Sequence, residues 1–593
     1  MTNTDKEERW LTELREQYPA DYLEQLDLRD EHQRVGGAKA KAEDYALRCI
    51  PSTWRWNWAS VMWVVWGGVT FLYAFYLGGL VSSAYGTYAF LISAVVSLVW
   101  MIFPSLWFSY KSSIEGVSAD LVSRGTFGYG GSAFSTFIYV FLWIYYFAAE
   151  GIIMASALVS YAPQIPVWGW EIMVAAIFVP LTLYGMSFLS KFQLISWFFW
   201  LPLVSAMVIL AFYGHNQNFV SMTLPAMLAY KGAGMTFSNV MLATGAGFGL
   251  FVLWPLWAMD YGRFLKLKQR KYGTLAYWLP YTLVPWFDYV IGGFIALVAV
   301  GHQANPGVYS VYLLGIGGVI LSIVTQLRIN VENVYSGSLS FSNFFSRAVH
   351  WVPGRRLWVY VFIVAALLAM EGDILNYAAV ISTFFSIFLG AWITVMFVDY
   401  TVVRKWLNLP LHTEFRRAYL KNWNVPMLAA MWISILINLF PSLQIEGVIS
   451  ASPSLGPAWY EASTWLFAII ESAVLTVVFS YIAVAGKTDK HEAGMKMYFS
   501  RMPEKMPANL VHNEEYVCTV CHQRNYKSDY ALCPWYAGGL YICSYCCMGT
   551  NCGNACKKSM KPLGHQIPAV APHGFVDPML SDVKEGKAPE TNV

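Results

Sequence analysis

The chain has 593 residues, of which 57% are hydrophobic, 17% aromatic and only 13% charged, and its mean hydropathy is +0.44. Soluble globular chains carry roughly 25% charged residues, so half that share excludes an ordinary soluble enzyme. The formal net charge of +3 is too small for nucleic-acid binding, which shows a clear basic patch or stripe. The composition therefore predicts an all-α polytopic membrane protein.

Residues 1–50 are predicted to form a polar, cytoplasmic N-terminal segment. The first residues, MTNTDKEERWLTELREQ, contain no short apolar run before a small-residue cleavage site. We therefore expect no secretory signal peptide, so that membrane insertion relies on the transmembrane segments themselves.

Residues 51–487 form the predicted transmembrane domain. A bilayer core needs about 20 mainly apolar residues per spanning helix. Such runs predict about twelve spans, near residues 58–81, 87–109, 133–160, 168–189, 192–213, 236–261, 277–300, 310–333, 356–370, 375–400, 424–441 and 461–485.

Lysine and arginine gather in alternate loops between these spans. Five of them fall within residues 263–271, after the sixth span, whereas the intervening loops are nearly free of positive charge, with Lys231 the exception. This alternation follows the positive-inside rule and predicts a multi-pass protein of the cytoplasmic membrane with both termini in the cytoplasm. Because an odd number of spans would break the alternation, twelve is favoured.

Glycines cluster in two of the spans. The first contains Gly67 and Gly68, and the sixth contains Gly245, Gly247 and Gly249. Paired interruptions five helices apart predict discontinuous helices in an inverted-repeat transporter. The alternative is that these glycines only permit close helix packing.

Five motifs, in order along the chain, resemble those of nucleobase:cation symporter-1 transporters. They are RGTFGYGGS (Arg124–Ser132), MDYGRF (Met259–Phe264), INVENVYSGSLSFSN (Ile329–Asn343), DYTVVRK (Asp399–Lys405) and KNWNVPMLA (Lys421–Ala429). The resemblance extends over about residues 50–485. It implies a LeuT-type fold of two inverted five-helix repeats plus two extra helices. It also implies uptake of nucleobases, hydantoins, allantoin or related small heterocycles, coupled to sodium ions or protons.

Four residues of the third span lie on one helical face, because Trp143, Tyr146, Phe147 and Glu150 are spaced i, i+3, i+4 and i+7. The resemblance implies that Tyr146 stacks on the solute and that Glu150 stands where the family has a hydrogen-bonding Gln. An acid at bilayer depth costs about 2.5–3.5 kcal/mol on insertion scales and is a functional candidate by default. Glu150 could instead be protonated, or paired with a buried arginine.

Further substrate contacts are implied on the sixth and eighth spans. Counting back nine residues from Asp260 gives Phe251 as a second stacking ring, with ordinary packing as its alternative role, and the eighth span offers polar side chains near the broken helices. The predicted substrate site thus comprises Gly67, Gly68, Tyr146, Glu150, Gly249, Phe251, Asn330, Glu332 and Asn333.

Arg328 is the clearest departure from the family pattern. The family supplies hydroxyl residues to its sodium site just before the motif that begins near Asn330, and this chain has Arg328 and Ile329 there. A guanidinium stays charged at any relevant pH and should exclude sodium, so we expect sodium-independent transport. Glu150 and Glu332 would then accept protons or balance a cationic or amidine-bearing solute. An Arg328–Glu332 pair that satisfies itself, or an alignment shift of one residue, would remove this argument.

Other intramembrane acids carry less information. Asp288 in the seventh span and Glu471 in the twelfth match no family role. The pairs Asp260–Arg263 and Asp399–Arg404 lie at predicted cytoplasmic helix ends, where structural or gating ion pairs are expected.

Eight of the nine cysteines lie in the C-terminal tail. After a linker at 488–514, residues 515–560 are predicted to form a metal-binding module, followed by a disordered segment at 561–593. The ligands would come from Cys518, Cys521, Cys533, Cys543, Cys546, Cys547, Cys552 and Cys556. Thiolates in two C-x-x-C pairs favour one or two zinc ions over an iron–sulfur cluster, and disulfides are rare in the cytosol. A cysteine-rich module of this kind could also bind a cytoplasmic partner protein.

The sequence as a whole predicts a secondary active transporter that imports a small planar nitrogenous solute, coupled to H+ or Na+, and not an enzyme. No hydrolase constellation or nucleotide-binding P-loop is found. Two alternatives stay open: a transporter-like receptor that signals through the metal-bearing tail, and a membrane redox enzyme with an iron–sulfur tail.

Overall fold

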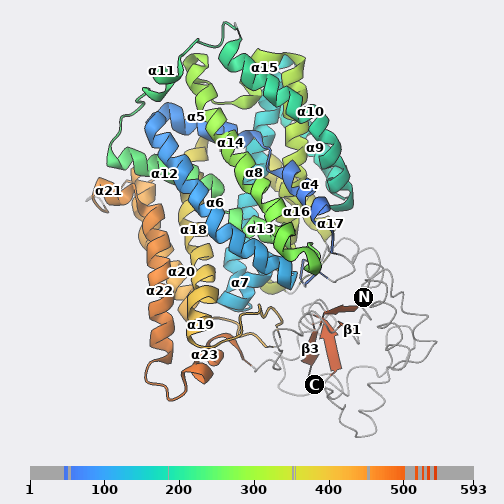
Figure 1. The fold of residues 1–593 in the computed structure, drawn as a ribbon, viewed down its shortest axis with the longest axis vertical. Helices are drawn as coiled ribbons and strands as arrows, with labels where there is room; N and C mark the ends of the chain where they lie inside the picture. The colour runs from blue at the N-terminus through green and yellow to red at the C-terminus, as the bar shows by residue number, and fades with distance from the viewer. Residues whose placement is uncertain are drawn as a thin grey trace, which may run out of the picture.

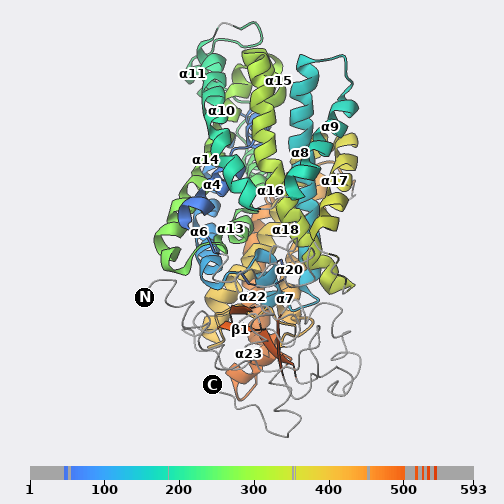
Figure 2. The same ribbon diagram turned by 90° about the vertical axis from the view of Figure 1, so that its right-hand side faces the viewer.

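The computed structural model describes most of the helical region and four short strands of the tail. The described residues are 46–47, 49–50, 55–183, 186–214, 216–349, 351, 353, 355–417, 419–450, 455–500, 515–517, 524–526, 530–533 and 540–543. Figures 1 and 2 show the helices standing side by side along the long axis of one elongated bundle.

Each predicted span falls on a helix or on a pair of consecutive helices. In chain order these are α4 (Trp58–Gly68) with α5 (Leu72–Tyr85), α6 (Thr87–Glu115), α8 (Ser132–Tyr161), α9 (Val167–Leu183), α10 (Met186–Tyr213), α12 (Phe237–Phe251) with α13 (Trp254–Gly262), α14 (Arg270–Val298), α15 (Pro306–Leu314) with α16 (Ile316–Ala348), α17 (Arg355–Glu371), α18 (Ala378–Val398), α20 (Val425–Ile445) and α22 (Thr464–Val484).

Short elements connect these helices. They are α7 (Ala119–Phe127), α11 (Leu224–Leu228), η3 (Leu267–Gln269), η4 (Val300–His302), η5 (Ile374–Tyr377), η6 (Asp399–Val403), α19 (Arg404–Trp406), α21 (Ala458–Glu461) and α23 (Lys490–Tyr498).

Eight helical segments of the described region are long and apolar enough to cross a membrane, and the bent pair α4–α5 makes a ninth. The other three predicted spans are less apolar or shorter: α9 and α17 have 17 residues each, and α16 carries Arg328 and Glu332 in its middle. These charges are tolerated because both side chains are fully buried inside the bundle.

Helix packing repeats itself with an offset of five spans. The first span (α5) packs on the seventh (α14), and the sixth (α12) packs on the second (α6). In the same way α10 packs on α4, as α18 packs on α12. Contacts that recur five spans later are what two inverted five-helix repeats produce.

The first span is broken, as the glycine pair predicts. The helices α4 and α5 meet at a 47° bend, separated by residues 69–71. A Cβ atom on Gly67 would overlap the side chain of Gln193, and one on Gly68 would overlap the carboxylate of Glu332. Both glycines therefore let polar side chains approach the end of α4.

The sixth span differs from the prediction. Its interruption lies at Val252 and Leu253, after the glycine cluster, and Gly245, Gly247 and Gly249 lie within the continuous helix α12. A Cβ on Gly249 would overlap the backbone carbonyl of Ser382 on α18. These glycines permit close helix packing, which was the alternative reading of the sequence.

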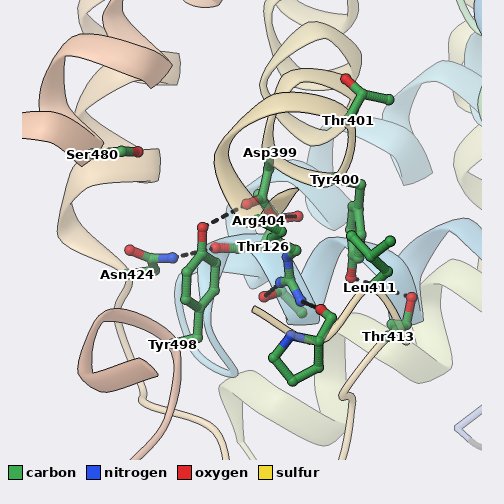
Figure 3. A network of polar contacts seen from close by, with 12 residues as sticks. Thr126, Asp399, Tyr400, Thr401, Arg404, Leu411, Thr413, Asn424, Ser480 and Tyr498 are labelled. Carbon is green, nitrogen blue, oxygen red and sulfur yellow. Dashed lines mark hydrogen bonds and ion pairs between the residues drawn. The ribbon is translucent and has the colours of Figure 1, made fainter. Parts of the chain in front are cut away.

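One end of the bundle is closed by a buried polar network around Asp399 (Figure 3). Its Oδ2 accepts hydrogen bonds from Thr126 (2.9 Å) and Arg404 (3.1 Å), and its Oδ1 accepts one from the hydroxyl of Tyr498 (2.5 Å). The Arg404 guanidinium lies 4.1 Å from the ring centroid of Tyr400 and 4.5 Å from that of Tyr498. The expected Asp399–Arg404 ion pair is confirmed, and it is a tertiary anchor for the C-terminal helix.

The helix α23 lies within the predicted linker and packs at this end of the bundle. The backbone N–H of Lys421 donates to the carbonyl of Tyr498 (2.8 Å), and that of Ser500 donates to the carbonyl of Tyr419 (2.8 Å).

The tail contains two antiparallel strand pairs. The strands β1 (Glu515–Val517) and β2 (Arg524–Tyr526) pair with each other, as do β3 (Tyr530–Cys533) and β4 (Leu540–Cys543). Cys533 and Cys543 are the last residues of β3 and β4. The other predicted ligands, Cys518, Cys521, Cys546, Cys547, Cys552 and Cys556, lie outside the described residues.

Candidate substrate and ion site

A cavity lies beside the break in the first span. The space between its lining atoms, counted together with its open side, is about 270 Å³. Side chains from the start of α5, from α8, from α16 and from the break between α12 and α13 line it. They are Phe71, Trp143, Tyr146, Glu150, Leu250, Leu253, Trp254, Trp257, Ile329 and Asn333.

Aromatic rings form most of the wall. Trp254 and Trp257 lie one helical turn apart on α13 with ring centroids 5.4 Å apart, and Trp143 of α8 packs 5.7 Å from Trp257. The hydroxyl of Tyr146 donates to the carbonyl of Leu250 (3.2 Å), near the end of α12. The interruption of the sixth span thus leaves carbonyl groups that Tyr146 satisfies.

Glu150 faces the cavity and also holds the start of α5. Its carboxylate oxygens accept the backbone N–H of Tyr73 at 3.3 and 3.2 Å, and only 1% of its surface is exposed. A carboxylate is favoured at a helix N-terminus because the backbone N–H groups there carry partial positive charge. Within the part of the chain that the structure describes, no arginine pairs with Glu150, and the side chain of Gln326 lies beside it.

Two asparagines of α16 form a short chain of hydrogen bonds. Asn333 lines the cavity and donates to the side-chain oxygen of Asn330 (2.8 Å). Asn330 donates to the carbonyl of Phe147 (3.3 Å). Asn330 therefore orients Asn333 and does not line the cavity itself.

Behind the cavity, a second cluster joins α16 to the end of α4. Arg328 donates from Nη2 to the carbonyl of Trp66 (3.2 Å) and from Nε to the side-chain oxygen of Gln193 (3.2 Å). The amide of Gln193 donates to Glu332 (3.0 Å). The hydroxyl of Tyr261 donates to the other oxygen of Glu332 (2.5 Å).

Gln193 therefore stands between Arg328 and Glu332. Within the described residues these two form no direct ion pair, although they are one turn apart on α16, so the self-satisfied pair considered from the sequence is wrong. The guanidinium also lies 4.8 Å from the ring centroid of Trp197 and 5.4 Å from that of Trp200.

The chain is similar to known transporters in sequence and in fold. The "Putative purine-cytosine permease YxlA" of Bacillus subtilis (strain 168) is 25% identical over 439 residues, which cover 70% of this chain and 90% of the relative. Mhp1 in an inward-facing conformation superposes with a TM-score of 0.53 at 16% identity, over 78% of this chain and 98% of Mhp1.

A second structure of Mhp1, described as a nucleobase-cation-symport-1 family transporter, is closed around bromovinylhydantoin. It gives a TM-score of 0.50 at 15% identity, over 76% of this chain and 99% of Mhp1. No protein-family model matches the chain. The chain has the nucleobase:cation symporter-1 fold. This fold, together with the sequence similarity to a permease, confirms the resemblance inferred from the five motifs.

Against this symporter fold, three predicted substrate residues line the cavity: Tyr146, Glu150 and Asn333. The others do not. Phe251 is fully buried, with its ring against Trp254 and Tyr289 at 5.2 and 5.6 Å. Gly67, Gly68, Gly249, Asn330 and Glu332 lie in the layer behind the lining.

Sequence reasoning missed the two tryptophans of α13. Trp254 lies three residues after Phe251, beyond the helix break, so the family offset selects a ring that does not line the cavity. The W-x-x-W spacing of Trp254 and Trp257 is the signal that could have found them. Nothing in the sequence marks Gln193, whose role depends on the tertiary approach of α10 to α16.

Proposed function

We propose that this protein is a secondary active transporter that imports a small planar nitrogenous solute, of the nucleobase or hydantoin kind or an amidine. The observation that carries the proposal is the cavity beside the helix break. Its wall is aromatic, and the polar side chains among its non-aromatic lining residues are the carboxylate of Glu150 and the amide of Asn333.

The cavity chemistry suits a flat heterocycle. Aromatic rings such as Trp254 and Tyr146 prefer to stack on or meet planar rings edge-on. An ionised Glu150 offers acceptors only, whereas Asn333 offers its side-chain oxygen as an acceptor and the one amide N–H that Asn330 does not accept. A ring N–H or an amidine N–H of the solute would therefore point at Glu150, and a ring carbonyl or nitrogen at Asn333.

We further propose that uptake does not need sodium and is coupled to protons. Arg328 places a guanidinium on the Trp66 carbonyl at the end of α4, next to the position where the resemblance puts a sodium ion. A fixed positive charge there repels a cation, because arginine does not deprotonate.

The test begins with binding to the purified full-length protein. Thermal shifts are measured with cytosine, hypoxanthine, hydantoin, allantoin and benzamidine. A ligand at 100 times its Kd should stabilise the protein by about 2.7 kcal/mol. Failure of all five probes both to raise the melting temperature and to enter proteoliposomes would contradict the proposed solute class.

Uptake of the stabilising probe is then compared in sodium and in choline buffer over a range of pH. Equal uptake in the two buffers, rising with an inward proton gradient, is expected. Strict dependence on sodium would overturn the argument from Arg328.

We also propose that both termini face the cytoplasm and that residues 515–560 bind one or two zinc ions. The support is the two short antiparallel strand pairs, one of which has Cys533 and Cys543 at opposite ends of its ladder, since so small a β module has little core without a metal. The purified full chain should contain zinc and be colourless. A coloured protein with iron would indicate an iron–sulfur cluster instead, and a metal-free tail would contradict the proposal.

A transporter-like receptor remains the second proposal for the tail. Deleting 515–560 should then leave uptake unchanged and abolish a downstream response.

A further inference from the structure

Around the break of the first span, the positively charged side chain lies at the end of α4, and two of the three acidic side chains lie at the start of α5. Arg328 binds a carbonyl at the end of α4. Glu150 binds the N–H of Tyr73 in α5, and the carboxyl of Asp288 on α14 lies against the N–H of Phe71, the residue before α5. Positive charge thus faces a helix C-terminus and negative charge a helix N-terminus, as the helix dipoles favour.

The charges do not balance in number. One guanidinium, on Arg328, stands against the three carboxyl groups of Glu150, Asp288 and Glu332, and all four side chains are buried. An uncompensated buried charge costs several kcal/mol, and a carboxyl group in that position takes up a proton instead. The cluster therefore needs a proton on at least one of its acids.

Hydrogen bonds distinguish the three acids. Glu332 accepts from Tyr261 and from Gln193, one on each oxygen. Glu150 accepts the Tyr73 N–H with both oxygens. The Oδ2 atom of Asp288, in contrast, has no hydrogen-bond partner within the protein.

Two other buried polar atoms near Asp288 also lack protein partners. They are Nη1 of Arg328, on α16, and the hydroxyl of Tyr309, on α15, and both side chains lie within electrostatic range of Asp288. Glu150 of α8 is the other charged group that acts on it. A carboxyl group, a guanidinium and a phenol thus share one buried region, and each has a polar atom without a hydrogen-bond partner. In such a site the carboxyl group can either hold a proton or lose it and form an ion pair with the guanidinium.

We propose that Asp288 is the residue that carries the coupling proton; this rests on the proposed proton-driven uptake. In the conformation described here Asp288 is a neutral acid. When water reaches it, its Oδ2–H bond breaks, the proton passes to water, and the carboxylate attracts the free Nη1 of Arg328. Because Arg328 also holds the Trp66 carbonyl, loss of the proton pulls on the end of α4, which connects protonation to the helix break.

The first test detects the proton directly. Infrared spectra of the purified full-length protein are compared with those of Asp288→Asn, which keeps the size and the acceptor facing Phe71. The carbonyl band of a protonated carboxylic acid should be present in the wild-type spectrum at neutral pH and lose intensity in the variant. An unchanged band would overturn the proposal. Tyr309→Phe supplies a second reading, because removing the neighbouring hydroxyl should move the band without abolishing it; a band that ignores both substitutions is not that of Asp288.

The second test concerns coupling and uses radiolabelled cytosine in proteoliposomes. With an inward proton gradient the wild-type protein should concentrate cytosine, whereas Asp288→Asn should exchange it without concentrating it. Concentrative uptake by the variant would overturn the role of Asp288. If neither protein moves cytosine or any other probe, the proposed solute class fails, while the infrared result still decides whether Asp288 is protonated.

Discussion

Glu150 serves two purposes with one carboxylate, because it lines the cavity and caps α5 through the Tyr73 N–H. The two purposes can be separated by substitution. Glutamine keeps an oxygen for the N–H but removes the charge, whereas alanine removes both.

For stability, Glu150→Gln should be close to wild type, because the helix cap is retained. Glu150→Ala should lose about 1 kcal/mol, the usual cost of removing a cap. Thermal unfolding in detergent measures both. An equal loss in the two variants would show that the charge, and not the hydrogen bond, supports α5.

For binding, Glu150→Gln should weaken benzamidine more than hydantoin, because only the amidinium carries a charge to be balanced. Hydrogen bonds to charged groups contribute about 1.5–3 kcal/mol, so a loss of about tenfold or more in benzamidine affinity is expected. Calorimetric titration checks it, and equal effects on both probes would contradict the charge argument.

At the scale of helices, the glycine at the break of the first span and the glycine in the packed sixth span differ in the atoms that a methyl group would meet. On Gly249 a methyl group would meet the backbone of Ser382, which cannot turn away, whereas on Gly68 it would meet the flexible side chain of Glu332. Overpacking of a core costs typically about 1–3 kcal/mol.

We expect Gly249→Ala to lower the melting temperature more than Gly68→Ala. Gly317→Ala on α16 is the matched control, because its nearest neighbours would lie at 3.4 and 3.5 Å, an ordinary contact. Gly317 lies in the first turn of α16, where alanine is favoured over glycine by less than the roughly 1 kcal/mol of a helix interior, so Gly317→Ala should be neutral or slightly stabilising. A larger loss for Gly317→Ala than for Gly249→Ala would contradict this account of the packing.

Helix positions and the first break follow from the sequence, because apolar length and paired glycines are local signals. The second break has a local signal as well, because Pro255 stands in the first turn of α13 and has no N–H to donate to the carbonyl of Phe251. The cavity wall does not follow from the sequence. Trp254 lines the cavity and Phe251 lies in the core, and the hydroxyl of Tyr146, on another helix, donates to the carbonyl of Leu250. A local pattern cannot contain these tertiary contacts.

For the molecule as a whole, the anchor at Asp399 joins the C-terminal helix to both halves of the bundle. Thr126 belongs to α7, Arg404 follows α18, and Tyr498 ends α23. Burial, reinforced by the Asp399 carboxylate, raises the pKa of Tyr498 well above its usual value. The hydroxyl therefore stays protonated and donates over the whole accessible pH range.

Tyr498→Phe should loosen α23 without dissolving the bundle, because the ring still stacks on Arg404 while Oδ1 of Asp399 loses its donor. Hydrogen–deuterium exchange of residues 490–498 should become faster, and exchange in α8 should not change. Tyr213→Phe is a control at a position that is 84% exposed. Unchanged exchange in α23 would show that the backbone pairs at Lys421 and Ser500 suffice to hold it.

The position of α23 also dictates where the chain can be shortened. A truncation designed from hydropathy would end just after α22, near residue 487. It would remove the Tyr498 hydroxyl that donates to Asp399 and the Ser500 hydroxyl that donates to the carbonyls of Tyr419 and Leu420. Cutting after Ser500 keeps these contacts. A detachable reporter or affinity handle for crystallisation or cryo-microscopy is therefore best fused beyond that serine, where it replaces the cysteine-rich tail and spares the transporter body.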